Sequence, residues 1–227
     1  IGASAAQRTL RRLGSKKGAT NAMTVLLDNR AVGRLVGMLG GALTAASLQQ
    51  KRSFFEGKLG QQVISPLVSI TDDPLVPGGF GSRKFDNEGI AAKPRIVFEN
   101  GVLKSYYVDT YYGRKLKMEP TSGSTSNLSW KLGTKSQKEL LAEAKDALLI
   151  TSFIGGNSNS GTGDFSVGVV GFLVRNGEIA EPVAEMNLSG NHLEFWKKLV
   201  AIGNDPFPYS AMRSPTLMFE NVSVAGT

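Results

Sequence analysis

The segment VLLDNRAVGRLVG, residues 25–37, opens the most regular apolar pattern in the chain. Apolar residues continue at helical spacing as far as Leu48. Asp28 or Asn29 can cap the start, because a short side-chain oxygen accepts a hydrogen bond from a free backbone N–H of the first turn. We therefore expect a single long helix over residues 30–51.

Glycines recur along this expected helix, with Gly33, Gly37 and Gly41 spaced four residues apart. That spacing puts them on one face, where another backbone can approach closely. Each glycine costs a helix about 1 kcal/mol relative to alanine, so we expect close packing, inside the domain or at a subunit interface, to offset the loss. A membrane span is the alternative because about 20 apolar residues suffice. Arg34 inside the run and the polar residues at its end favour a buried helix and no membrane contact.

Metal-binding side chains are scarce in this sequence. The chain has one histidine, His192, and no cysteine. Protein zinc sites use neutral imidazole, thiolate or carboxylate donors. A lone histidine near the start of a helix is more often a packed residue than a ligand. We expect no metal ion or other cofactor on this chain.

The pattern changes after residue 62 to short apolar runs separated by turns. Residues 95–108 and residues 169–183 each carry an Asn-Gly pair between apolar runs, which is a strong short-range signal for a β-hairpin. The capping-box spacing of Ser136 and Glu139 predicts a helix over residues 136–150.

A shorter helix is expected over residues 192–202, with Gly203 as its stop, and residues 76–82 and 155–163 are expected to form loops. The sequence thus predicts an α+β fold. Its β-rich core is an antiparallel sheet or barrel, accompanied by the long glycine-rich helix and two or three further helices.

Positive charge is concentrated in the first quarter of the chain. The net charge is +7, and residues 1–60 hold ten Lys or Arg against two acids. A basic cluster can contact nucleic-acid phosphates or an acidic protein surface. The cluster contains no interleaved aromatics and no DNA-binding motif, which disfavours nucleic acid as the partner. No signal-peptide pattern occurs at the start, so we expect a cytoplasmic protein.

Catalytic patterns are weak throughout. The glycine-rich residues 155–163 lack the Gly-Lys-Ser/Thr ending of a phosphate-binding loop. No Gly-x-Ser-x-Gly elbow is present to carry a serine nucleophile. The acidic pairs Asp72–Asp73 and Asp86/Glu88 adjoin Pro74 and Gly89, which favours turns or strand edges. We expect no independent active site.

Six short blocks resemble the TldD/PmbA family and occur in that family's order: residues 6–14, 85–89, 99–103, 162–166, 181–185 and 200–205. Metal-bearing members of the family are similar over residues 25–37, where they read V-L-L-H-E-A-x-G-H. In this chain Asn29, Arg30 and Arg34 stand where the two histidines and the glutamate would be, with Asp28 as an apparent insertion. A guanidinium has only N–H donors and a fixed positive charge, so it cannot replace a metal ligand.

The resemblance is closer to the PmbA/TldE branch and implies how the chain is organised. Residues 1–22 would end a linking helix from an N-terminal domain, and residues 23–227 would form the C-terminal domain. Since family members are about twice as long, the sequence is expected to be a fragment. Asp164 and Ser166 fall in a segment that lies near the family's substrate region, which makes them candidates for lining a groove.

The function implied by the resemblance is that of a metal-free subunit in a cytoplasmic peptidase that cleaves flexible or unfolded peptides. A TldD-like partner would carry the zinc, and this chain would supply interface and peptide-path surface. Two alternatives remain open: a homodimeric module that binds peptides or proteins without hydrolysis, and a modulator of DNA gyrase.

Overall fold

Five strands close into a barrel in the computed structural model, which describes residues 1–226. Their order around the ring is β1 (Asn21–Leu27), β6 (Ala147–Ser158), β7 (Asp164–Arg175), β8 (Glu178–Asn191) and β10 (Leu217–Ala225). β10 closes the ring by pairing with β1, and β9 (Leu199–Ile202) extends the sheet from β10. The β1–β6 pair is parallel and the other pairs are antiparallel.

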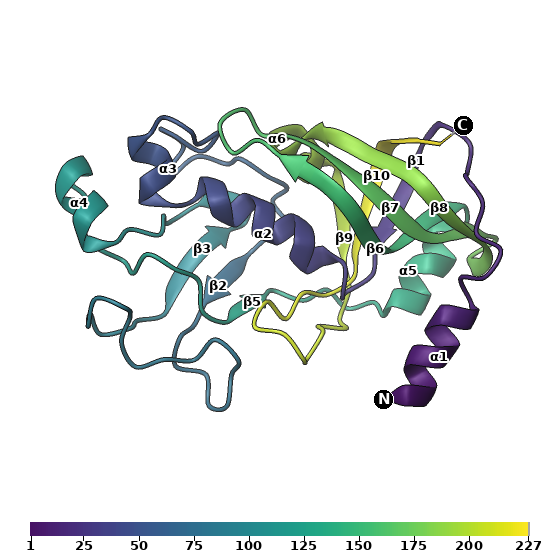
Figure 1. Ribbon diagram of the computed structural model, residues 1–227, viewed down its shortest axis with the longest axis horizontal. Coiled ribbons are helices and arrows are strands. Elements are labelled where there is room, and N and C mark those ends of the chain that lie inside the picture. Colours follow the sequence, from purple (N-terminus) through teal and green to yellow (C-terminus); the bar gives the residue numbers. More distant parts are fainter. Residues whose placement is uncertain (227) are drawn as a thin grey trace.

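A second, smaller sheet lies beside the barrel (Figure 1). Its strand order is β4 (Val102–Leu103), β3 (Arg95–Glu99), β2 (Ile70–Asp72) and β5 (Leu128–Trp130). Helix α2 (Val32–Ala42) runs between the two sheets (Figure 1). Its apolar face joins both to one hydrophobic core.

The remaining helices are short and lie around these layers. They are α1 (Gly2–Leu10), α3 (Ala45–Gln49), α4 (Thr110–Leu116), α5 (Gln137–Ala144), α6 (His192–Phe195) and the 3-10 turn η1 (Trp196–Lys198). α1 buries none of its residues. The α+β class and the barrel-like core predicted from the sequence are confirmed.

Both Asn-Gly hairpins are confirmed. Asn100 and Gly101 have φ of 48° and 79°, and Asn176 and Gly177 have φ of 52° and 82°. Two successive residues with positive φ define the type I′ turn, whose twist matches that of the flanking strands. Residues 76–82 form a loop, as predicted.

The prediction of one helix over residues 30–51 was wrong, because the helix breaks after Ala42 and α3 begins separately. Thr44 is extended (φ −84°, ψ 143°) and caps α3 by accepting a hydrogen bond from the Ser47 N–H. The backbone here is tied to a distant segment: Tyr107 N–H donates to Leu43, and Ala45 N–H donates to the Tyr107 carbonyl. This long-range pairing replaces the hydrogen bonds of a continuous helix.

Two other helices end earlier than predicted. The capping box at Ser136 is present, but α5 stops at Ala144, and residues 147–150 enter β6 to pair with β1. Likewise, α6 and η1 end at Lys198, and β9 then pairs with β10. The apolar residues that follow each helix are buried by strand pairing in the barrel, which takes the place of further helical turns.

β6 also runs further than expected, to Ser158, into the segment predicted as a loop. Gly155 and Gly156 have positive φ values of 56° and 88° within a register shift against β7. A bulge of this kind bends a strand without ending it. Within residues 1–226, no helix is long and apolar enough to cross a membrane.

Candidate functional site at helix α2

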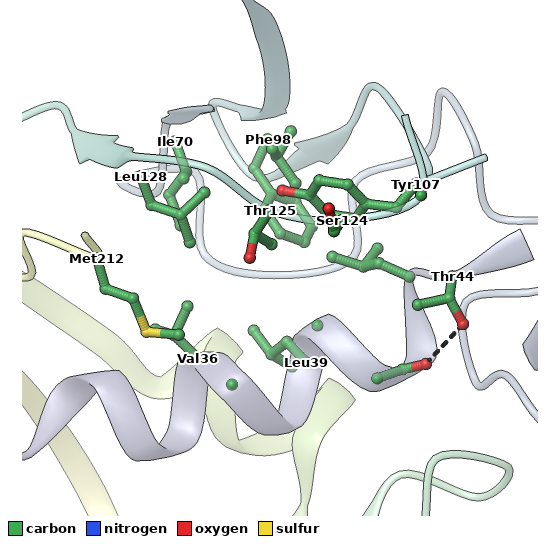
Figure 2. A pocket seen from close by; sticks show the side chains of 16 residues that line it. Val36, Leu39, Thr44, Ile70, Phe98, Tyr107, Ser124, Thr125, Leu128 and Met212 are labelled. Carbon is green, nitrogen blue, oxygen red and sulfur yellow. Dashed lines mark hydrogen bonds between the residues drawn. The ribbon is translucent and has the colours of Figure 1, made fainter. Parts of the chain in front are cut away.

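Helix α2 separates two cavities. The first, called the α2 cavity below, has a volume of about 310 Å³ and lies between α2 and the small sheet. Figure 2 shows Val36 and Leu39 of α2 facing Phe98, Ile70 and Leu128, with Met212 at one end and Thr44 at the other. Its lining is mostly apolar, and the residues around it that the structure describes include no charged side chain.

The second cavity, called the β6 groove below, has a volume of about 550 Å³ and lies on the other side of α2. It is bounded by Arg34 and Met38 of α2 and by residues 156–158 and 160, at and just after the end of β6. Gly37 and Gly41 line both cavities. The two spaces therefore adjoin across the glycine face of the helix.

Gly33, Gly37 and Gly41 do not pack against another backbone in this chain. A Cβ at Gly33 would meet the Met212 sulfur at 3.3 Å, one at Gly37 would lie 3.9 Å from Met212 Cε, and one at Gly41 would meet nothing within 4 Å. Nothing inside the chain therefore compensates for the helix-propensity cost of Gly41. Gly37 and Gly41, on the open part of this glycine face, line both cavities.

The three side chains at the degenerate metal motif each have a protein partner. Asn29 Nδ2 donates to the Asp205 carbonyl at 2.7 Å, and the Arg30 guanidinium lies 4.9 Å from the centre of the Phe207 ring. Arg34 Nη2 donates to the Gly155 carbonyl at 3.1 Å.

These side chains do not fit a metal. Two of the three are guanidinium groups without a lone pair to offer, and they carry positive charge. Among residues 1–226, no group of three His, Cys, Asp or Glu side chains is arranged to hold an ion.

One edge of β6 is open beside the β6 groove. β1 pairs with β6 only through Ile150, while residues 152–158 pair with β7 alone. Ile154 on this part of the strand is 59% exposed. Apart from the Gly155 carbonyl, which accepts from Arg34, such an edge can offer backbone donors and acceptors to an extended chain.

Asp164 and Ser166 line a third cavity, of about 630 Å³, at the far side of the β6 tip. Asp164 accepts hydrogen bonds from Asn191 and Thr162, and these bonds hold the pKa of its carboxyl below the ordinary value. Ser166 donates to Asn187. The structure therefore brings both predicted residues to one surface hollow, separate from the α2 cavity.

His192 is fully buried and does not face any of these cavities. Its Nε2 lies 3.0 Å from Ser158 Oγ, and its ring stacks on Phe165 with centroids 4.5 Å apart. Burial lowers the pKa of His192 to about 4. A neutral, enclosed imidazole of this kind is a packed residue.

A buried charge pair supports the wall of the α2 cavity. Asp72 ends β2, in keeping with the turn or strand-edge position expected from Pro74. It is fully buried, and its Oδ2 lies 4.0 Å from Arg95 Nε. Arg95 also lies over the ring of Tyr107, which lines the cavity, and burial raises the pKa of the Tyr107 phenol. The sequence did not predict this cluster, because Asp72 and Arg95 are brought together only by the long-range pairing of β2 with β3.

A family model described as the PmbA/TldA metallopeptidase C-terminal domain matches residues 20–226. The chain belongs to the PmbA/TldD family. The metalloprotease PmbA of Escherichia coli O157:H7 is 31% identical over all of this chain and 51% of its own length. The PmbA homologue of Haemophilus influenzae is also 31% identical, over 100% of this chain and 51% of its own length. The chain thus spans about half the length of these PmbA/TldD relatives.

Solved structures in the PmbA/TldD group agree with the fold. A Bacteroides thetaiotaomicron protein described as a candidate modulator of DNA gyrase superposes with a TM-score of 0.97 at 43% identity, covering 100% of this chain and 52% of its own. TldE from Thermococcus kodakarensis has a TM-score of 0.88 at 22% identity, covering 100% of this chain and 55% of its own, and supports the fold alone.

Proposed function

We propose that this chain is the metal-free, PmbA/TldE-like subunit of a two-component peptidase. The observation that carries the proposal is the occupation of the motif positions by Asn29, Arg30 and Arg34, each engaged by another part of the chain. A metallopeptidase family member with this donor set needs zinc and a general base from elsewhere. Under the proposal a TldD-like subunit provides both, in the cytoplasm.

The contribution of this chain is peptide binding. The open edge of β6 can add an extended peptide as a further strand, with main-chain hydrogen bonds providing sequence-tolerant affinity. The neighbouring β6 groove gives such a peptide room, and the open face at Gly37 and Gly41 lets its backbone approach α2. Flexible or unfolded peptides suit this mode, because a folded substrate cannot present an unpaired strand.

The test is cleavage of a flexible peptide by this chain mixed with the zinc-motif subunit from the same genome. Gly41→Leu puts a side chain into the shared open face, where an added Cβ meets nothing within 4 Å, so we expect the mixture containing it to lose most of its activity while assembly is retained. Gln49→Leu, on the exposed side of α3, is the matched control and is expected to keep activity. Equal activity of the partner with and without this chain would refute the proposal.

A second candidate is modulation of DNA gyrase through DNA binding, favoured by one cluster of arginines. Arg8 of α1, Arg11 and Arg12 directly after it, and Arg30 line a cavity of about 530 Å³ in which Asp28 is the acidic residue. Binding to duplex DNA that weakens a thousandfold between 50 and 200 mM salt would indicate several phosphate contacts. Binding that is absent at 50 mM salt would remove this candidate.

A further inference from the structure

The α2 cavity is large enough for one aromatic or branched aliphatic side chain. An enclosed apolar cavity of about 150 Å³ can hold a benzene molecule, and this one measures about 310 Å³. Pockets of about 300 Å³ or more with an apolar lining and a few polar groups are typical of specific ligand sites. Side-chain hydroxyls of Ser124 and Thr125 supply those polar groups here.

The lining also limits the chemistry of an occupant. Val36 and Leu39 on one side and Phe98 on the other form an apolar interior, and the cavity has no charged lining residue among residues 1–226 to neutralise a buried charge. Burying an unpaired charge is strongly unfavourable. The occupant of the interior is therefore uncharged and apolar.

The two glycines shared with the β6 groove indicate how that occupant is attached. Gly37 and Gly41 line both spaces, and a Cβ at Gly41 would meet nothing within 4 Å. A peptide main chain lying in the β6 groove can thus come close to the α2 backbone and turn one side chain into the α2 cavity. Met212 at the end of the cavity has a flexible thioether that can adjust to side chains of different shape.

We propose that the α2 cavity is a specificity pocket that accepts one apolar side chain, such as leucine or phenylalanine, from the extended peptide. This inference rests on the peptide-binding role proposed above and adds a side-chain preference to it. Main-chain pairing with β6 gives affinity for any flexible peptide, and the α2 cavity selects the position at which that peptide sits.

The experiment measures binding of fluorescein-labelled, end-blocked octapeptides to the purified chain by fluorescence anisotropy. The peptides are serine- and glycine-rich and differ only at the fifth position, which is leucine, phenylalanine, aspartate or glycine. Full burial of a leucine or phenylalanine side chain favours binding by a factor of about ten to one hundred. We expect the leucine and phenylalanine peptides to bind that much more tightly than the other two.

Gly40 lines the cavity, so Gly40→Leu adds a side chain there and is the deciding variant. A Cβ at Gly40 meets nothing within 4 Å, and leucine favours a helix more than glycine does, so the variant should fold. It should remove the preference for leucine and phenylalanine while leaving the weaker binding of the glycine peptide unchanged. Gly40→Ala, which adds only a methyl group, is the matched control and should retain the preference. Thr125→Phe, from an exposed position at the mouth, is a second way to block the cavity.

The outcomes separate this inference from the proposed function. Tight binding of apolar peptides that both blocking variants abolish supports it. Peptide binding without an apolar preference, or a preference that survives Gly40→Leu and Thr125→Phe, overturns the specificity pocket and leaves the peptide-binding role intact. Failure of every octapeptide to bind overturns both.

Discussion

His192 is the single histidine of the chain, and its environment predicts a specific pH dependence of stability. The ring is fully buried between Phe54 and Phe165, with centroid distances of 5.6 and 4.5 Å. Nε2 meets Ser158 Oγ at 3.0 Å, while Nδ1 has no hydrogen-bond partner in the structure. Burial penalises the imidazolium and lowers the pKa from 6.5 to about 4.

The sign of the effect follows from which state binds the proton. Above pH 6.5 the imidazole is neutral in both states, so its full contribution to stability is present. As the pH falls from 6.5 towards 4, the unfolded chain takes up a proton that the folded chain does not, and the free energy of unfolding falls. At 1.36 kcal/mol per pH unit, the loss is about 2 kcal/mol at pH 5 and about 3 kcal/mol below pH 4.

Urea unfolding followed by tryptophan fluorescence at pH 7.5 and pH 5.0 measures this loss, because Trp130 and Trp196 are both buried. His192→Gln is the control, since an amide does not titrate and can still hydrogen-bond Ser158. We expect the fall in stability between the two pH values to be about 2 kcal/mol smaller in the variant. An equal fall in both proteins, or an imidazole NMR titration centred near pH 6.5 in the folded chain, would refute the reasoning.

Three further substitutions test the packing by urea unfolding. Asp72→Asn should lower the free energy of unfolding by about 3–5 kcal/mol, because it leaves the buried Arg95 without its counter-charge. Adding Arg95→Met should recover part of that loss. An unchanged unfolding midpoint in the single variant would show that the pair is not coupled. Gly171→Ala should cost about 1–3 kcal/mol or more, because its Cβ would lie 1.9 Å from the Leu149 carbonyl oxygen. Wild-type stability in this variant would show that close β6–β7 packing does not require a glycine here. Ser136→Ala should cost about 1 kcal/mol by removing the capping box of α5, and no loss would indicate that the cap adds nothing.

Local chemistry predicted both Asn-Gly turns and the cap of α5 correctly. Two other predictions were wrong: α2 has Ala31 as its N-cap with no side-chain cap, and Gly203 follows β9 and does not end a helix. Asn100-Gly101 and Asn176-Gly177 form hairpin turns, because only residues tolerant of positive φ suit a two-residue connection. The Ser136 capping box starts α5 where its spacing indicated. These features depend on neighbours within four residues, so the sequence contains all the information they need.

Features that depend on distant partners were not predictable in the same way. The helix break at Thr44 depends on hydrogen bonds to Tyr107, and the end of α5 depends on the place that β1 offers to residues 147–150. For the site, the sequence identified the α2 positions and the glycine spacing. It gave no sign of the α2 cavity or of the Asp72–Arg95 pair, since both are formed by segments more than 20 residues apart.

The proposed function rests on this chain being a metal-free subunit. The most direct test is to measure zinc content and peptidase activity for this chain alone and after mixing with the zinc-motif subunit from the same genome. We expect no zinc above background and no cleavage by the chain alone, because Arg30 and Arg34 offer no metal-binding lone pair. Cleavage should exceed that of the zinc-motif subunit alone once the two are mixed. Stoichiometric zinc in the isolated chain, or hydrolysis without a partner, would contradict the account.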